Sequence, residues 1–434
     1  MIYSLPKKRK QMFSKKLFLI PLLFLLHYPI ESNAYSVLTH EAIIDASWKI
    51  AIEPLLLKKY PASTPEQLLE AHSYAYGGSI IPDIGYYPFG SKVFTNLVHN
   101  IRSGDFTVAL IEEAQDLNEY AFALGALAHY MADNYGHSIA TNVSVPLLYP
   151  EIKEQFGPIV TYADHKKSHS RVEFGFDVMQ TARENYASKA YHDFIGFNVS
   201  RKVIERAFFR TYGLDVNDVF GSMSVAIGVF RWSVKSLLPT IVKAAWVNKR
   251  SDIKKINPNA TSRSFSYRMK NRTYYHEFGR DHEKAGIVPT IVSFLLPIMP
   301  KIGPLSKTKF KKLNPETEQL FVKSFETTLS HYSVALNTLH SQRLTLANRT
   351  LDTGKETAPG EYVIADQNYD GYLLKLKDGK FENLTSHLKS HLISFYGKTK
   401  PAPVNKKCLK RYQAITEALT LLQNAPVMDA GKGL

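Results

Sequence analysis

The stretch that most restricts the fold is residues 121–137, AFALGALAHYMADNYGH. It has the apolar composition of a buried helix, yet His129, Asp133 and His137 recur at every fourth position. Such positions lie on one side of a helix, and at a rise of ~1.5 Å per residue the two histidines are about 12 Å apart. One zinc ion with ligands at about 2 Å cannot reach both. The spacing predicts more than one ion with Asp133 as a bridge, the alternative being ordinary polar helix residues.

Further metal-type side chains follow the same order along the chain. His40 lies in SVLTHEA, Asp83 follows an apolar-Pro step in GGSIIPDIGYYP, and His99 lies in NLVHNI. His169 and Glu173 are four residues apart, which puts them on one face of a helix and suits a His/carboxylate pair of ligands. Taken singly, each of these features is weak, because a lone histidine on an apolar face is usually a core residue and a lone His/Glu pair is usually a surface pair.

The N-terminal residues 1–34 have the pattern of a secretory signal peptide. Basic residues precede the apolar run LFLIPLLFLLHYPI, and Ser32 and Ala34 are small residues at a cleavage site. Cleavage there removes six of the 54 basic residues and one of the 39 acidic ones, so the formal net charge falls from +15 to +10 with Tyr35 as the first residue. We therefore expect a secreted or periplasmic protein whose charge favours anionic partners. Cys408 is the single cysteine, so no intramolecular disulfide is expected.

The pattern of apolar residues predicts a mainly α protein. Helical spacing dominates residues 35–250, which we assign to one domain. Residues 251–284 are basic and polar and are interpreted as a loop or linker, and residues 285–434 as a mostly helical C-terminal region. Within that region, GEYVIADQNYDGYLLKLKDGKF predicts a β-hairpin around Asp370-Gly371.

Taken together, the ordered series of metal-type residues resembles the zinc-dependent phospholipase C family and the related three-zinc S1/P1-type nucleases. The resemblance covers about residues 35–250 and rests on nine positions in the family order: Tyr35, His40, Asp83, His99, His129, Asp133, His137, His169 and Glu173. Tyr35 stands where the family usually has Trp; its amine and carbonyl can still chelate. The interval between Asp133 and His137 is shorter than in the family, and His165, one turn before His169, is an alternative ligand.

The resemblance implies three zinc ions. Asp83, His99, His129 and Asp133 would hold the first, Tyr35 and His40 the second with Asp133 as bridge, and His137, His169 and Glu173 the third. It also implies phosphodiester hydrolysis by a zinc-activated water, with Asp83 as a ligand and the base that orients that water.

Three alternatives to a phospholipase C remain at this stage. A nuclease of the same architecture is disfavoured because those enzymes use Asp where Glu173 stands and tend to carry disulfides. Phospholipase D-type cleavage is the second alternative, and a non-catalytic envelope-binding homologue is the third. We expect a phospholipid or membrane surface as the partner rather than nucleic acid.

Overall fold

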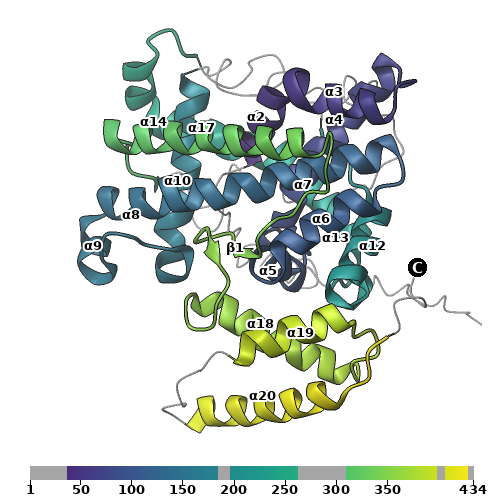
Figure 1. Ribbon diagram of the computed structural model, residues 1–434. Coiled ribbons are helices and arrows are strands. Elements are labelled where there is room, and N and C mark those ends of the chain that lie inside the picture. Colours follow the sequence, from purple (N-terminus) through teal and green to yellow (C-terminus); the bar gives the residue numbers. More distant parts are fainter. Residues whose placement is uncertain (1–36, 184–195, 262–308, 398–405, 429–434) are drawn as a thin grey trace, which may run out of the picture.

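Helices form nearly all the regular structure in the computed structural model, which describes residues 37–183, 196–261, 309–397 and 406–428 (Figure 1). The α-helices of the described residues up to 256 are α2 (Val37–Ser47), α3 (Glu53–Lys59), α4 (Pro65–Ile80), α5 (Lys92–Asn100), α6 (Ser103–Glu113), α7 (Leu117–Tyr135), α8 (Asn142–Leu148), α9 (Pro150–Phe156), α10 (Tyr162–Ala182), α12 (Arg201–Tyr212), α13 (Met223–Trp232) and α14 (Leu238–Ile256). Short π-helical segments are η1 (Trp48–Ile52), η3 (Gly136–Thr141) and η5 (Ser233–Leu237), and 3-10 turns are η2 (Ile81–Tyr86) and η4 (Val216–Asp218).

The C-terminal part adds α17 (Pro315–Thr338), α18 (Val363–Asp378), α19 (Ser386–Gly397) and α20 (Lys406–Asn424). Its two short strands, β1 (Arg349–Thr350) and β2 (Lys355–Glu356), pair antiparallel. The predicted mainly α fold is therefore confirmed. None of the described helices is both long and apolar enough to cross a membrane.

Helix α7 lies at the centre of the core and is buried on all sides from Glu119 to Asn134. Its N-cap is Asp116, whose side chain accepts a hydrogen bond from the backbone N–H of Glu119 at 2.8 Å. Two glycines bring α7 against α4. A Cβ on Gly78 would lie 1.9 Å from the carbonyl oxygen of Phe122, and one on Gly125 would lie 2.0 Å from that of Ala75. No larger residue fits at this crossing, which fixes the end of α4 beside the metal-type side chains of α7.

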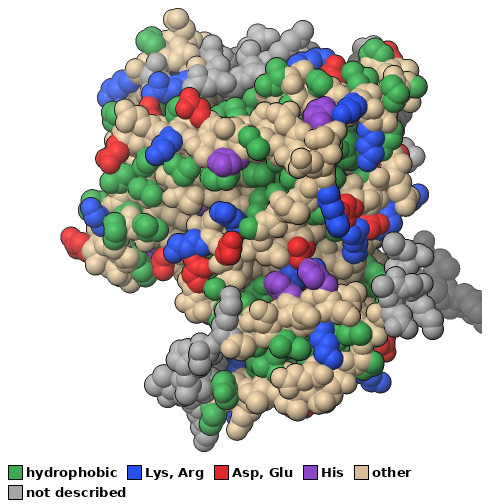
Figure 2. Space-filling model, in the orientation of Figure 1, with side chains coloured by type: hydrophobic (Ala, Val, Ile, Leu, Met, Phe, Trp, Pro, Cys, Tyr) green, Lys and Arg blue, Asp and Glu red, His purple; other side chains and the backbone are tan. Residues whose placement is uncertain are grey.

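The C-terminal part packs on the same core. Helix α17 lies across α7, where the buried Tyr332 hydroxyl donates a hydrogen bond to the Leu124 carbonyl at 2.9 Å. Helices α18 to α20 form a layer at the bottom of Figure 1, and the Tyr372 hydroxyl joins α18 to the Tyr212 carbonyl of α12 at 2.5 Å. Figure 2 shows histidine side chains at the surface where this layer meets the main body.

The expected hairpin is wrong, and the expected loop differs from the structure at its start. The segment expected to form a hairpin around Asp370-Gly371 is helix α18, because Tyr369, Tyr372 and Leu376 are buried at helical spacing and Gly371 lies on the exposed side. The strands occur upstream, in β1 and β2. Helix α14 continues to Ile256, so the first residues of the expected 251–284 loop are helical. The rest of that loop from 262, the signal peptide 1–34 and Tyr35 lie outside the described residues.

Candidate metal centre

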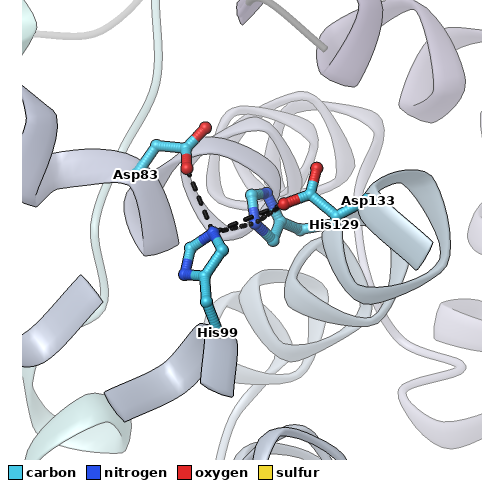
Figure 3. Close-up of side chains that lie close together, drawn as sticks. All are labelled: Asp83, His99, His129 and Asp133. Carbon is cyan, nitrogen blue, oxygen red and sulfur yellow. Dashed lines mark hydrogen bonds and ion pairs between the residues drawn. The ribbon is translucent and has the colours of Figure 1, made fainter. Parts of the chain in front are cut away.

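The first cluster is formed by side chains from three elements. Asp83 lies in η2, His99 in α5, and His129 and Asp133 lie one turn apart in α7. All four are buried, and one ligand-type atom of each lies within 4.8 Å of the others. Figure 3 shows His99 between the two carboxylates, with its Nε2 at 3.2 Å from Asp83 Oδ1 and 3.3 Å from Asp133 Oδ2. Residues far apart in the sequence thus converge on one point.

Backbone carbonyls orient the two imidazoles of this cluster. Nδ1 of His99 lies 2.8 Å from the Thr95 carbonyl, and Nδ1 of His129 lies 2.8 Å from the Ser79 carbonyl at the end of α4. Because a carbonyl can only accept, each Nδ1 donates a proton and each Nε2 faces the cluster. The two Nε2 atoms are 3.2 Å apart. Two such lone pairs repel each other unless a cation or a proton lies between them.

The electrostatics of the cluster favour a cation. Burial raises the pKa of the Asp133 carboxyl, but the imidazoles of His129 and His99 outweigh this and hold the pKa well below its usual range. Burial lowers the pKa of His99, yet Asp133 and Asp83 raise it to about 10. Asp133 is fully buried, and the neighbours of its two oxygens are the imidazoles of His40, His99 and His129 at 3.2–3.5 Å. A buried carboxylate is costly unless positive charge lies beside it.

His40 lies against this cluster from α2. Its Nε2 is 3.5 Å from Oδ1 of Asp133 and 4.0 Å from Oδ2 of Asp83, and its ring stacks on His129 with centroids 4.5 Å apart. Burial first and the neighbouring His129 second lower the pKa of His40 to about 4, which keeps the imidazole neutral. A neutral imidazole beside a carboxylate oxygen is the form that binds metal.

The second cluster contains His137, His169 and Glu173, all buried. Nδ1 of His169 is 2.8 Å from Oε1 of Glu173, and Nε2 of His137 is 3.7 Å from the same oxygen. The other nitrogen of His169 lies 2.8 Å from the Asn142 side-chain oxygen, while Asn142 Nδ2 donates to the carbonyl of Asp352. Nε2 of His169 therefore carries the proton, and Nδ1 faces Glu173.

The short interval between Asp133 and His137 is accommodated by a change of helix type. Helix α7 ends at Tyr135, and His137 lies in the π-helical segment η3, which directs it to the second cluster. His165 lies at a kink in α10 with φ −149° and ψ 76°, and its Nδ1 accepts a hydrogen bond from the Ser168 N–H at 3.2 Å. His137, and not His165, stands with His169 and Glu173.

Two residues of the C-terminal part, Asp352 and Tyr362, lie beside the second cluster and were not singled out from the sequence. Asp352 lies 3.7 Å from His137, and the Tyr362 hydroxyl donates to the other oxygen of Asp352. Both line a cleft of about 160 Å³ that also contains His99, Tyr86, Tyr162 and two lysines, Lys92 and Lys166. Asp352 lies in a loop between the two short strands, where no periodic pattern marks it as functional.

The donor set fits zinc. The two clusters offer imidazole nitrogens and carboxylate oxygens without thiolates, which is typical of hydrolytic zinc sites. Three histidines, His99, His129 and His137, face the clusters through Nε2. Their Nδ1–H groups donate to backbone carbonyls, those of Thr95, Ser79 and Leu351 in that order. The site residues named from the sequence are thus brought together, except for Tyr35, which is outside the described residues; their binding of metal stays a prediction.

The structure is thus a helical protein with two buried His/carboxylate clusters that could each hold a metal ion, the first around α7 and the second between η3 and α10. Residues 39–221 match the family model described as zinc dependent phospholipase C. No curated protein and no solved structure matches the chain. The family match ends before the C-terminal part that contributes Asp352 and Tyr362.

Proposed function

We propose that the protein is an extracytoplasmic zinc-dependent phosphodiesterase that hydrolyses phospholipid head groups in the manner of a phospholipase C. The observation that carries the proposal is the position of Asp133, whose Oδ1 faces His40 while its Oδ2 faces His99 and His129 at 3.2–3.5 Å. One carboxylate shared between two sets of imidazoles is the arrangement of a bridged pair of ions. Zinc in such a centre supplies hydroxide near neutral pH and polarises phosphoryl oxygens.

Asp83 is suited to orient the attacking water. Its side chain is 8% exposed, whereas that of Asp133 is fully buried, so Asp83 is the carboxylate of the first cluster that solvent reaches. Its two oxygens face His99 and His40, which places it between the two proposed ion positions. A carboxylate there can both hold an ion and accept a proton from water.

The cleft beside His99 supports an anionic substrate. Lys92 and Lys166 line it together with three tyrosines, and the Lys166 ammonium lies over the ring of Tyr162 at 5.1 Å from its centroid. Positive groups next to the first cluster would attract a phosphate and hold it near Asp83. We therefore assign the two lysines to phosphate binding.

The proposal is tested by product analysis. Mature protein beginning at Tyr35 is loaded with zinc and given mixed phospholipid vesicles, with DNA and RNA in parallel. Diacylglycerol and a phosphorylated head group are the expected products. Asp83→Asn should lower kcat by about 100-fold or more, while the control Glu356→Gln, at an exposed strand position, leaves it unchanged. Phosphatidic acid or cleaved nucleic acid as the main product would refute phospholipase C activity.

A further inference from the structure

The turn before α5 exposes an aromatic side chain on a strained backbone. The N–H of Gly90 donates to the carbonyl of Tyr87 at 3.0 Å, which closes a turn with Pro88 and Phe89 at its centre. Phe89 has φ +65°, a value that the third position of a turn normally leaves to Gly or Asn. It is also 56% exposed, so its ring adds little to the core. Strain of this kind is typical of residues that serve a function rather than the packing of the fold.

This turn adjoins the cleft beside the first cluster. Tyr86 and Lys92, three residues to either side of Phe89, both line the cleft, so the Cα atom of Phe89 lies within ~11 Å of theirs. His99 of the first cluster lines the same cleft. The cleft opens to solvent, because the side chain of Lys92 in its wall is exposed. Phe89 therefore stands near the opening through which a substrate reaches the first cluster.

Two more exposed apolar side chains adjoin residues of the cleft wall. Val93 follows Lys92 on α5 and is 45% exposed, and Val363, the first residue of α18, is 56% exposed. The chain neighbours of Val363, Tyr362 and Ile364, both line the cleft. Apolar side chains therefore border the cleft from α5, within the residues that match the family model, and from α18, beyond them.

Lysines accompany these apolar side chains. Lys92 and Lys166 line the cleft, and Lys167 is the next exposed residue of α10. Apolar groups beside lysines are the combination that binds an anionic lipid surface, because the apolar groups enter the interface while the ammonium groups attract the phosphates. A second copy of this chain on the same surface would bring like charges together. The charge thus favours a lipid surface over self-association.

We infer that the exposed apolar and basic side chains around the cleft form a docking surface for an anionic phospholipid bilayer. The docking surface consists of Phe89, Val93, Val363, Lys92, Lys166 and Lys167. When it lies on a bilayer, the cleft faces the lipid head groups, which then reach the first cluster without leaving the membrane surface. The inference rests on the proposed function for its choice of a phospholipid bilayer, but docking itself breaks no bond.

Docking is measured with lipids that contain no phosphodiester, so that binding is separated from turnover. Zinc-loaded mature protein is sedimented with vesicles of digalactosyldiacylglycerol, with and without phosphatidic acid, at several salt concentrations. We expect binding that requires phosphatidic acid and weakens as salt screens the lysines. Vesicle binding by the wild type that is absent, or that is equal with and without phosphatidic acid, would overturn the inference.

Substitutions test whether the named side chains make the contact. Phe89→Asn, which suits the positive φ, should weaken vesicle binding about 10-fold or more, because it removes the largest apolar group. We expect about fivefold from Val363→Ser and about fivefold from Lys167→Gln. Val334→Ser is the matched control: Val334 is 62% exposed on α17, a helix that contributes no described residue to the cleft wall, and its binding should equal that of the wild type.

A second measurement separates the docking surface from the cleft and from the proposed function. Wild type and Phe89→Asn are compared on phospholipid vesicles and on a soluble nitrophenyl phosphodiester. We expect Phe89→Asn to raise the vesicle concentration needed for half-maximal hydrolysis. An equal loss on the soluble substrate would place Phe89 in the cleft and overturn the inference. Docking without hydrolysis of any phospholipid would overturn only the proposed function.

Two further outcomes would also count against the docking surface. Vesicle binding that Val334→Ser weakens as much as Val363→Ser would show that exposed valines anywhere on the protein contribute. Dimers in solution that Phe89→Asn dissociates, without vesicle binding, would assign the surface to a second copy of the chain. If Phe89→Asn does not fold, the double variant Val93→Ser/Val363→Ser takes its place, and wild-type vesicle binding by that variant would overturn the inference.

Discussion

Oδ1 of Asp133 lies 3.5 Å from Nε2 of His40, on the opposite side of the carboxylate from the oxygen that faces His99 and His129. His40 and the other two imidazoles therefore approach different oxygens of one acid. We predict that His40→Ala lowers the bound zinc by one ion, and that Asp133→Asn lowers it by two. Elemental analysis of zinc per chain, on protein dialysed against buffered free zinc, measures both.

His72 provides the control for that comparison. It is a half-buried histidine that pairs with Asp45 at 3.2 Å and stacks on Trp48, away from both clusters. His72→Gln should keep the zinc content of the wild type. Equal losses in His40→Ala and Asp133→Asn would show that Asp133 does not serve two ions.

The crossing of α4 and α7 should tolerate no side chain. Gly125→Ala places a methyl group 2.0 Å from the Ala75 carbonyl, and separating the helices also moves Ser79 away from His129. We expect a loss of about 1–3 kcal/mol or more in the free energy of unfolding, because overpacking a buried contact costs about that much. Chemical denaturation measures the loss of stability, and zinc titration measures the effect of moving Ser79 away from His129.

A matched glycine in α18 should respond in the opposite direction. Gly371 lies in an exposed helical position where an added Cβ meets nothing within 4 Å. Gly371→Ala should therefore stabilise the protein by about 0.5–1 kcal/mol, the difference in helix propensity. If Gly125→Ala and Gly371→Ala lower the free energy of unfolding equally, the close approach at Gly125 is not the cause of the destabilisation.

Periodicity predicted the parts of the site that one helix carries. His129 and Asp133 are four residues apart on a continuous buried helix, so their common side follows from helix geometry alone. The hairpin expectation failed because the turn signal of Asp370-Gly371 was weaker than the burial of Tyr369 and Tyr372 on one helical face. Tertiary packing of the helical face therefore outweighed the local turn preference of these two residues.

The remaining parts depend on contacts that no short segment encodes. The π-helical segment that redirects His137 is a change in backbone geometry with no residue signature in the sequence. Asp352 reaches the second cluster only because its loop is hydrogen-bonded to His99 and Asn142, more than 200 residues earlier in the chain. Sequence reasoning could name candidate ligands that follow helical spacing, but not a side chain that a distant loop brings beside the cluster.

His391 gives a pH dependence of stability unrelated to the metal centre. It is a half-buried residue of α19, near Arg102, Asp105 and His387, and its Nε2 lies 2.8 Å from the Tyr369 hydroxyl. Burial first, and the charge of Arg102 second, lower the pKa of His391 from 6.5 to about 4. The folded state thus holds the imidazole neutral, while the unfolded chain takes up a proton below pH 6.5.

The stability from this residue is complete above pH 6.5 and is lost as the pH falls toward 4, with a slope of at most ~1.4 kcal/mol per pH unit. His391→Phe, which keeps the ring in place but cannot be protonated, should flatten the slope between these values. Urea unfolding of zinc-loaded protein at a series of pH values measures it. If the free energy of unfolding depends on pH in His391→Phe as it does in the wild type, other groups cause the acid sensitivity.

Removal of zinc should destabilise the fold because the metal sites leave acids buried beside one another. Asp133 is fully buried, and Glu173 and Asp352 flank the second cluster. A ligand present at a free concentration of 100 times its Kd adds about 2.7 kcal/mol to the free energy of unfolding, and each further bound ion adds a contribution of the same kind. We expect chelation with EDTA to lower Tm by several degrees and re-addition of zinc to restore it. Magnesium, which prefers oxygen ligands in octahedral geometry, should not restore Tm. A Tm indifferent to both treatments would mean that the clusters are stabilised by protons rather than by metal.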